Sequence, residues 1–499
     1  MDSLVMASPF GWLSWIACAI FFHHIKTSQT RKEAFWLGWG FWTTYLAFSL
    51  DWLYTAMHVY GEMPAAIALL LVVVLSALLA LYHATACAVY FQLKSKNILT
   101  QALLFSALIT MAELARGTWL TGFGWANPAY TQITGPLAVY ASWGGVYTID
   151  FLLFFCSSVL ASLIYQIWSL RLASLKLNKA AASGLILIAG LMGLGFGQPL
   201  ALFSFSKPNP LENGKPLSVE LLQGNIAQSQ KFDEEGTLFA LKWYRQKMFE
   251  STASLVIAPE TAIPLLPDDL PPFYWSDLRH HFSIENKAAL IGSPWGSVES
   301  RYQNALVGLK PEQASPYLYF KYHLVPFGEY VPKMFKWVVD LMNIPLGNFQ
   351  AGKLIQPSFL WHGEKMAPTI CFEILFGEEM AERFNDKNDM PTMFINVSNL
   401  AWFGDSRALY QELSIARMRA LEFQRPILQA NNTGVTAVID KNGAIQDMLP
   451  LNYRGGLSAK VEGQEGVTPY AYWVVRVWVG AIWFILIFIV LSVDLCTTP

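Results

Sequence analysis

Charge and cysteine are both scarce in this chain of 499 residues. Only 14% of the residues are charged, whereas a soluble protein normally carries about a quarter. The formal net charge is −2, so the sequence does not indicate a nucleic acid or another polyanion as a partner. With 54% hydrophobic residues, the composition excludes an ordinary soluble protein of this length.

The chain has five cysteines, which are Cys18, Cys87, Cys156, Cys371 and Cys496. Only Cys371 lies in the polar region between residues 205 and 468, so counting excludes a disulfide within that region. No second cysteine and no histidine pair at ligand spacing accompanies Cys371, and we expect neither a metal nor a cofactor there. A packing residue or a nucleophile remain as interpretations.

Hydrophobic residues are gathered into runs long enough to cross a bilayer, which takes about 20 residues. Six runs precede residue 205, and a seventh lies near the carboxyl end. They cover approximately 7–24, 34–53, 64–93, 98–116, 143–166, 181–204 and 470–493. The sequence therefore predicts a polytopic α-helical membrane domain at 1–204, an extramembrane domain at 205–468 and a C-terminal transmembrane helix at 469–499.

The loops between the runs predict an orientation. Basic residues gather after the first, third and fifth runs, as Lys26, Lys94 and Arg171 illustrate, and the alternate loops lack them. Because basic loops stay in the cytoplasm, we expect the amino terminus and the region 205–468 outside and the carboxyl terminus inside. A cleaved signal peptide is an alternative for the first run, although that run lacks a basic leader.

Strand-like and helix-like patterns alternate through 205–468, which indicates a layered α/β domain. Three expected strands end at polar residues: SLVIAP at Glu260, YLYF at Lys321 and MAPTI at Cys371. Each residue by itself fits a solvated charge or a packing cysteine. Together they suit covalent acyl transfer, because a carboxylate can accept the thiol proton and an ammonium can stabilise the oxyanion.

Several motifs carry a resemblance to a known family. They are PETAIP (259–264), KYHLVPFGEYVP (321–332), ICFEI (370–374), NVSNLAWFGD (396–405) and, in the membrane part, ELARGTWLTGFGW (113–125). The set resembles the nitrilase, or carbon–nitrogen hydrolase, superfamily, and with the hydrophobic runs it looks like the apolipoprotein N-acyltransferases. The resemblance implies an αββα sandwich inserted before the last transmembrane helix and facing the periplasm from the bacterial inner membrane.

The resemblance further implies a catalytic trio of Glu260, Lys321 and Cys371. Cys371 would attack the acyl ester of a phospholipid and form a thioester, while Glu260 accepts the thiol proton. Lys321 and the backbone N–H of Phe372 would hold the oxyanion. The acyl chain would then pass to the amine of a diacylglyceryl-modified N-terminal cysteine of an apolipoprotein.

The remaining expectations concern supporting residues and partners. Glu329 and Glu373 match acidic residues that support the family's site. We expect a monomer whose partners are the lipid bilayer, a phospholipid acyl donor and diacylglyceryl-modified apolipoproteins.

The apolar segment 331–352 is predicted to be a lid that dips into lipid. The side chains expected to do so are Phe335, Trp337, Val338, Leu341 and Met342. The alternative is a small satellite core beneath a surface loop. Phe232 and Trp402 are also predicted to contact substrate or lipid.

Two departures from the family pattern change the charge near the expected site. Leu400 stands where aspartate is usual, and Glu412 stands where histidine is frequent. One alternative is thus a paralogue with a different acyl acceptor, and another is a membrane-tethered nitrilase-like amidase that passes the acyl group to water. From another class, a transporter or receptor with a periplasmic sensing domain is disfavoured, because the N-terminal runs hold little charge beyond Glu113 and Arg116, which are expected to pair.

Overall fold

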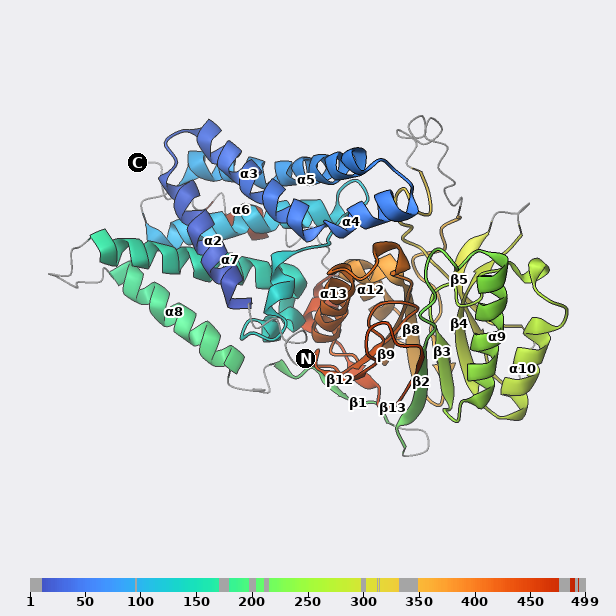
Figure 1. Cartoon of the computed structure of the whole chain (residues 1–499). Helices are drawn as coiled ribbons and strands as arrows, with labels where there is room; N and C mark the ends of the chain where they lie inside the picture. The colour runs from blue at the N-terminus through green and yellow to red at the C-terminus, as the bar shows by residue number, and fades with distance from the viewer. Residues whose placement is uncertain are drawn as a thin grey trace. The chain divides into compact units, whose positions relative to one another are not determined.

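The chain divides into two compact units (Figure 1). Unit 1 comprises Met1–Tyr54, Pro64–Phe205 and Thr468–Pro499, and unit 2 comprises Thr55–Met63 and Ser206–Val467. The structure, a computed structural model, describes residues 11–94, 97–169, 179–196, 203–210, 215–297, 302–311, 313, 315–331, 349–474, 485–489 and 492.

Unit 1 is built from helices. They are α2 (Gly11–Thr27), α3 (Arg31–Ser49), α4 (Trp52–Thr55), α5 (Ala65–Leu93), α6 (Ile98–Thr118), α7 (Ala141–Ser169) and α8 (Lys179–Phe196), with short 3-10 turns at η2 (Pro128–Gln132) and η3 (Ala138–Tyr140). Helix α7 is kinked, because Gly144 and Gly145 adopt non-helical backbone angles inside it. Each hydrophobic run before residue 205 coincides with one of these helices.

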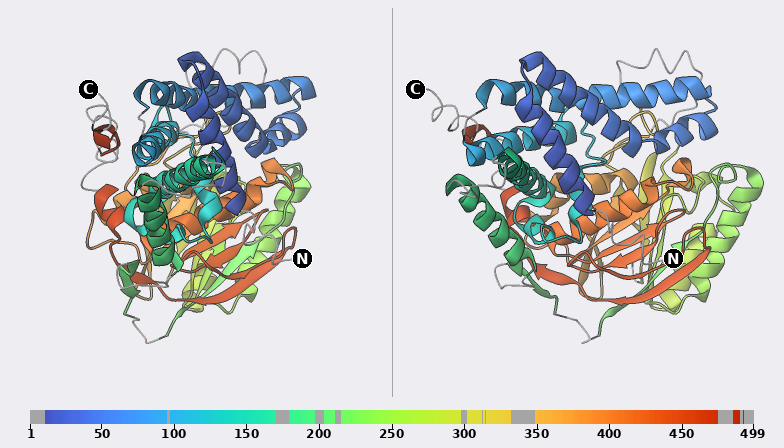
Figure 2. Two further views of the ribbon diagram at one scale, coloured as in Figure 1. Left: turned by 90° about the vertical axis from the view of Figure 1, so that its left-hand side faces the viewer. Right: turned by 60° about the vertical axis from the view of Figure 1, so that its left-hand side comes forward.

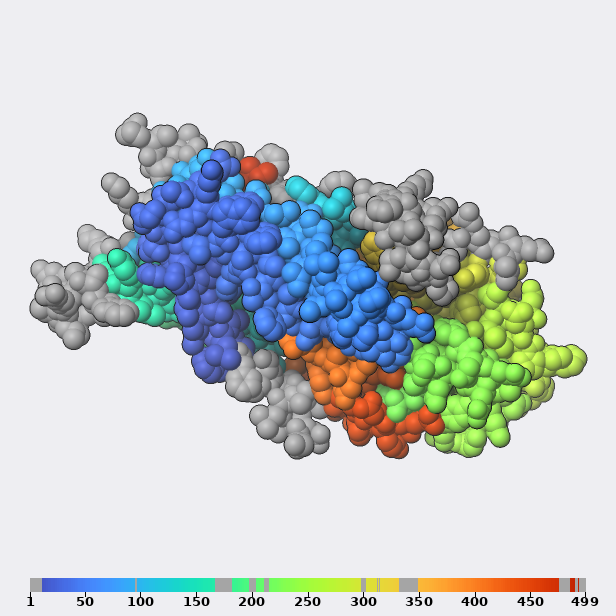
Figure 3. All heavy atoms as spheres, turned by 45° about the horizontal axis from the view of Figure 1, so that its top comes forward, coloured from blue at the N-terminus to red at the C-terminus, as the bar shows by residue number. Residues whose placement is uncertain are grey.

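Three helices in the described part of the chain are long and apolar enough to cross a membrane: Ala65–Leu93, Ile98–Thr118 and Ala138–Gln166. A shorter apolar helix covers Ala182–Phe196. Large apolar side chains such as Phe48 and Leu70 are more than half exposed, and α3 and α5 pack together into one continuous surface (Figure 3). Exposed apolar surface of this kind suits contact with lipid. Most of the predicted helix at 469–499 lies outside the described residues.

Unit 1 also encloses a group of polar side chains, here called the membrane-unit cluster, made of His83, Glu113, Arg116, Asn127 and Asp150. The expected pairing on α6 is confirmed, since Arg116 Nη2 lies 2.5 Å from Glu113 Oε2. His83 Nε2 lies 2.7 Å from Glu113 Oε1, and Asn127 Nδ2 donates to Glu113 at 3.0 Å and to Asp150 at 2.6 Å. All five side chains are buried, so the runs hold more buried charge than the sequence suggested.

Unit 2 is built on two six-stranded sheets. Their strand orders are β13-β2-β3-β4-β5-β6 and β12-β11-β10-β9-β8-β7. The strands are β2 (Leu217–Gln223), β3 (Leu255–Ala258), β4 (Ala288–Trp295), β5 (Gln303–Leu309), β6 (Tyr317–Phe320), β7 (Phe359–Trp361), β8 (Glu364–Ile370), β9 (Met393–Ser398), β10 (Ile427–Asn431), β11 (Ala437–Ile439), β12 (Ile445–Met448) and β13 (Gly455–Val461). A separate antiparallel pair joins β1 (Ser206–Pro208) to β14 (Gln464–Gly466).

Four layers stack in unit 2, with the helices outside and the sheets facing each other (Figures 1 and 2). Buried residues from both sheets, such as Leu221 and Ile395, form one core between them. A second core joins the first sheet to α9 (Glu234–Glu250) and α10 (Tyr274–Ile284). Helix α13 (Ala408–Phe423) packs on β10 and β11 of the second sheet. The predicted αββα sandwich is confirmed.

The central strands of the two sheets run parallel. Strands β2, β3 and β4 form one parallel set, and β8, β9 and β10 form the other. Strands β3 and β9 are buried along their whole length, as expected for parallel strands covered on both faces. Because the carboxyl ends of parallel strands meet at one edge of a sheet, the polar residues that follow β3, β8 and β9 are brought to such edges.

One short segment of unit 2 comes from the N-terminal part of the chain. Residues Thr55–Met63 contain a π-helical turn, η1 (Ala56–Tyr60), that contacts the turn η9 (Ala401–Phe403). The rings of Tyr60 and Trp402 meet edge to face with centroids 6.0 Å apart. No local pattern in the sequence predicts this attachment.

Candidate active site

Glu260 follows strand β3 and is held at both carboxylate oxygens. Asn304 Nδ2 donates to Oε1 at 2.7 Å, and the backbone N–H of Asn399 donates to Oε2 at 2.9 Å. The neighbouring strand β4 carries Gly292, where a Cβ would lie only 2.7 Å from the Cα of Glu260. A glycine is therefore required for β4 to approach the Glu260 backbone.

Lys321 follows strand β6 and is 1% exposed. Its Nζ lies 3.5 Å from Glu260 Oε1 and 2.9 Å from Glu329 Oε2. Burial by itself lowers the pKa of Lys321, but the carboxylates of Glu329 and Glu260 outweigh it, and the pKa is raised above the ordinary value. Lys321 is therefore a buried ammonium, held between two carboxylates.

Cys371 begins the tight turn η7 (Cys371–Leu375) directly after β8. Its φ is 53°, in the left-handed region that costs a residue with a side chain about 1–3 kcal/mol. Burial raises the pKa of the Cys371 thiol, Glu260 raises it further, and Lys321 opposes the increase. The resting thiol is therefore protonated, and a nucleophilic thiolate requires a base to take the proton.

Glu373 ties the Cys371 turn to the Lys321 strand. Its Oε2 accepts hydrogen bonds from the N–H of Ile370 at 2.7 Å and the hydroxyl of Tyr319 at 2.9 Å. Its Oε1 accepts from the N–H of Tyr322 at 2.6 Å and that of His323 at 3.3 Å. Burial raises the pKa of this carboxyl. One buried side chain thus ties together the two segments that carry Lys321 and Cys371.

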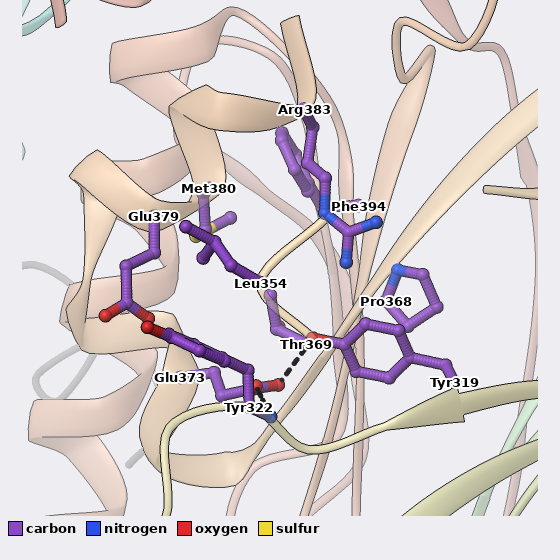
Figure 4. Close-up of a pocket in the computed structure, with 10 residues that line it drawn as sticks. All are labelled: Tyr319, Tyr322, Leu354, Pro368, Thr369, Glu373, Glu379, Met380, Arg383 and Phe394. Atoms are coloured by element: carbon purple, nitrogen blue, oxygen red, sulfur yellow. Dashed lines mark hydrogen bonds between the residues drawn. The ribbon is translucent and has the colours of Figure 1, made fainter. Parts of the chain in front are cut away.

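A small pocket lies beside Glu373 (Figure 4). Its lining residues are Tyr319, Tyr322, Leu354, Pro368, Thr369, Glu373, Glu379, Met380, Arg383 and Phe394. The hydroxyl of Tyr319 points toward the Glu373 carboxylate in this pocket, and the backbone N–H of Tyr322 donates to the same carboxylate, whereas the Tyr322 ring points toward Glu379 (Figure 4). The pocket backs the Cys371 turn, and its lining does not include the predicted trio.

The remaining predicted residues fall in different places. Phe372 is buried, and its ring lies 5.6 Å from that of His323. Phe232 is 62% exposed and Trp402 is 43% exposed. Trp337 and Leu341 lie outside the described residues, as do Phe335, Val338 and Met342. Their predicted roles stay predictions.

Sequence reasoning missed Asn304, Asn399 and Lys231. Lys231 is 2% exposed and donates to the backbone oxygen of Glu260 at 3.2 Å. Burial lowers the pKa of Lys231 to about 8. Asn399 lies inside the motif NVSNLAWFGD (396–405), but nothing in a single sequence distinguishes it from the other residues of that motif.

The two departures from the family pattern are both buried. Leu400 is an apolar residue fully enclosed before η9. Glu412, on α13, accepts hydrogen bonds from Asn431 Nδ2 at 2.8 Å and Gln429 Nε2 at 3.3 Å. In the described part of the chain, no group of three or more His, Cys, Asp or Glu residues could hold a metal ion.

Two family models match the chain. Residues 4–159 match the apolipoprotein N-acyltransferase N-terminal domain, and residues 219–467 match the carbon–nitrogen hydrolase domain. An apolipoprotein N-acyltransferase of Verminephrobacter eiseniae is 43% identical over 484 residues, which cover 94% of this chain and 88% of that protein. The chain belongs to the apolipoprotein N-acyltransferase family.

Other relatives agree with this assignment. An apolipoprotein N-acyltransferase of Ralstonia nicotianae is 39% identical, covering 94% of this chain and 87% of that protein. Among solved structures, an amidase of Nesterenkonia sp. is 15% identical with a TM-score of 0.38, and it covers 55% of this chain and 98% of the amidase. A carbon–nitrogen hydrolase of Helicobacter pylori has a TM-score of 0.36.

Proposed function

We propose that this protein moves a fatty acyl chain from a membrane phospholipid to the N-terminal diacylglyceryl-cysteine of apolipoproteins. The observation that carries the proposal is that Glu260, Lys321 and Cys371 follow strands β3, β6 and β8 and act on one another electrostatically in a member of this family. Glu260 is the proposed general base, Lys321 the oxyanion partner and Cys371 the nucleophile.

In the first half-reaction, the Cys371 sulfur attacks the ester carbonyl and its proton passes to Glu260. The oxyanion that forms is stabilised by the ammonium of Lys321 and the backbone N–H of Phe372. The intermediate then collapses with cleavage of the ester C–O bond. The leaving alkoxide takes the proton from Glu260, which gives an acyl thioester and a lysophospholipid.

In the second half-reaction, the free amine of the diacylglyceryl-cysteine attacks the thioester carbonyl. Glu260 accepts a proton from the amine, and the C–S bond breaks to form an amide. The Cys371 thiolate recovers the proton from Glu260, so the enzyme returns to its starting state. Glu260 needs to face both reactants in turn, which its fixed position between Asn304 and Asn399 favours.

The proposed supporting roles follow from the hydrogen bonds. Glu329 balances the charge of Lys321 and also accepts from the backbone N–H of Val325 at 2.8 Å. Glu373 positions the turn that carries Cys371. Removing either carboxylate is expected to displace a reacting group without removing it.

The membrane setting is part of the proposal. We propose a multi-pass inner-membrane protein that acts as a monomer, with a transmembrane domain at 1–204, a periplasmic catalytic domain at 205–468 and a final membrane helix at 469–499. The three long apolar helices and the basic loops support it. Trp402 and Phe232, both exposed, are proposed to contact lipid or substrate, together with Trp337 and Leu341.

Intact-protein mass spectrometry tests the first half-reaction. Purified protein is incubated with phosphatidylethanolamine vesicles beside a Cys371→Ala control. We expect a mass gain of one fatty acyl chain that hydroxylamine removes and that the control lacks. Absence of any adduct contradicts the proposal.

A diacylglyceryl-cysteine peptide tests the second half-reaction. Adding it to the acylated protein is expected to discharge the acyl chain onto the peptide amine. Discharge to water alone would instead support the nitrilase-like amidase.

A further inference from the structure

Glu412 contacts the strand ends beside the candidate nucleophile Cys371. Across the parallel strands, Ile370 pairs with Val397 and Ser398 pairs with Asn431. The next position after Ile370 is Cys371, so Cys371, Ser398 and Asn431 follow one another across the strand ends. Helix α13 packs against both η7 and β10 and directs the Glu412 carboxylate to this row, where Asn431 Nδ2 donates to it at 2.8 Å.

Glu412 is a buried carboxyl, 1% exposed, and no ion pair of the described residues includes it. Its hydrogen-bond donors in the described part of the chain are neutral side chains, those of Asn431, Gln429, Ser398 and Asn396. The titratable groups that face it are Glu260 and Cys371. The other carboxylates of the candidate site differ, because Glu260 and Glu329 lie beside Lys321 and Glu373 accepts from three backbone N–H groups. A lone carboxylate in such a place favours its neutral form.

The neighbouring amides fit a neutral carboxyl. Asn431 Oδ1 and Gln429 Oε1 are buried acceptors for which the structure shows no donor within the described residues. An ionised carboxylate can only accept hydrogen bonds, whereas a neutral carboxyl also supplies one O–H. Burial raises the pKa of Glu412 to about 7, and Glu260 adds to the effect against the hydrogen bonds from Ser398 and Asn431.

We propose that Glu412 is a positioning residue that makes the reactivity of Cys371 depend on pH. When Glu412 is neutral, the charges that act on the Cys371 sulfur are those of Lys321 and Glu260. Its ionised form adds a second negative charge, which disfavours the thiolate. The same negative charge contributes to the raised pKa of the Cys371 thiol. The inference depends on one part of the proposed function, namely that Cys371 is the nucleophile.

Alkylation of Cys371 by iodoacetamide tests this without any lipid substrate. The full-length protein is alkylated between pH 5.5 and 8.5, and the rate is read by mass spectrometry of the peptide that contains Cys371. In Glu412→Gln, the side chain keeps its shape but cannot ionise. We expect equal rates near pH 5.5 and an approximately fivefold faster alkylation of the variant at pH 8.

Two further variants complete the design. Asn431→Ser removes the 2.8 Å hydrogen bond that favours ionised Glu412, so its profile is expected to shift toward that of Glu412→Gln. This variant tests the idea even if Glu412→Gln does not fold. The matched control is Glu422→Gln on the same helix, since Glu422 is buried but pairs with Arg419 at 3.0 Å. We expect the control to keep the parental pH profile.

The outcomes separate this inference from the proposed function. A ratio of variant to parent that stays constant with pH overturns the role of Glu412, as does an equal change in Glu422→Gln. Failure to form an acyl thioester from phosphatidylethanolamine overturns the proposed function and leaves the alkylation result valid. If both proposals hold, thioester formation shows the same pH-dependent ratio as alkylation.

Discussion

Each unit of the molecule buries a carboxylate next to a cation. The two arrangements differ in how completely these charges are neutralised by partners within the protein. In the membrane-unit cluster, Glu113 and Arg116 lie three residues apart on α6. Arg116 Nη1 also donates to the backbone oxygens of Phe123 and Trp125, at 2.5 and 2.8 Å. Most partners of this ion pair thus come from α6 and the loop that follows it, and His83 of α5 adds one more to Glu113.

In unit 2, Lys321 and Glu329 lie in one stretch after β6, and Glu260 comes from a separate segment after β3. The charges of Glu260 and Lys321 act on Cys371, which remains partly exposed and has a strained backbone. A closed cluster stabilises a fold, because each charge has its partners already. An open cluster leaves its field available to a reacting group, which is how charge contributes to catalysis.

The largest expected effect is on the open cluster. Glu260→Gln removes the proposed base, and we expect acyl-thioester formation to fall about a thousandfold with little change in thermal unfolding. Glu250→Gln, on the exposed end of α9, is the control. Near-normal thioester formation in Glu260→Gln would show that another group takes the thiol proton.

The closed cluster is expected to respond in the opposite way. Glu113→Gln leaves the guanidinium of Arg116 buried without its carboxylate, which costs about 3–5 kcal/mol of stability. Thermal unfolding in detergent micelles should occur at lower temperature. The rate of acyl-thioester formation per folded molecule should stay within about twofold of the parent, with the folded amount measured by alkylation of Cys371. A large loss of rate with unchanged unfolding would assign the cluster a role in the reaction.

An intermediate effect is expected for Glu373, which belongs to the frame of the open cluster. In Glu373→Gln, an NH₂ group replaces one carboxylate oxygen and faces N–H or O–H donors. This lowers the free energy of unfolding by about 1–3 kcal/mol. Thioester formation should fall about tenfold to a hundredfold. The control is Glu379→Gln, another pocket-lining residue, whose carboxylate lies 2.8 Å from His323 Nδ1. Equal losses in both variants would contradict a special role for Glu373.

The smallest expected effect is a pH-dependent stability at Glu412. Its pKa is raised from 4.5 to about 7 in the folded state, so the folded protein binds that proton more tightly than the unfolded chain does. Stability from this proton is complete below about pH 4.5 and is lost as pH rises to 7. Glu412→Gln should therefore gain about 1–3 kcal/mol over the parent between pH 5 and 8. Thermal unfolding at both pH values checks it, and a pH-independent difference would contradict it.

Much of the fold could be predicted, because it depends on patterns that are local in the sequence. Continuous apolar runs such as LVIA in β3 and FINV in β9 indicate buried strands. Polar residues just after such runs lie where the strands end. That reasoning predicts that Glu260 and Cys371 lie at such strand ends, and the polar residue after YLYF adds Lys321. The pairing of Glu113 with Arg116 likewise follows from helical spacing.

The residues that were missed act across long distances in the chain. Asn304 joins Glu260 to Glu329 only because β5 lies beside β6 and β4 in the folded sheet. Asp150 and His83 enter the membrane-unit cluster from other helices than α6. The attachment of Thr55–Met63 to unit 2 is equally invisible in the local pattern.

The sequence by itself determined a layered α/β domain and the apolar helices, since both depend on periodicity. Its resemblance to a family added the αββα order of the layers and the proposed reacting groups. Only the tertiary structure decided which charges are neutralised and which remain available. A carboxylate's pKa and its hydrogen bonds depend on distances of a few ångströms between segments far apart in the chain, and Glu412 beside Cys371 is the case where that distinction matters most.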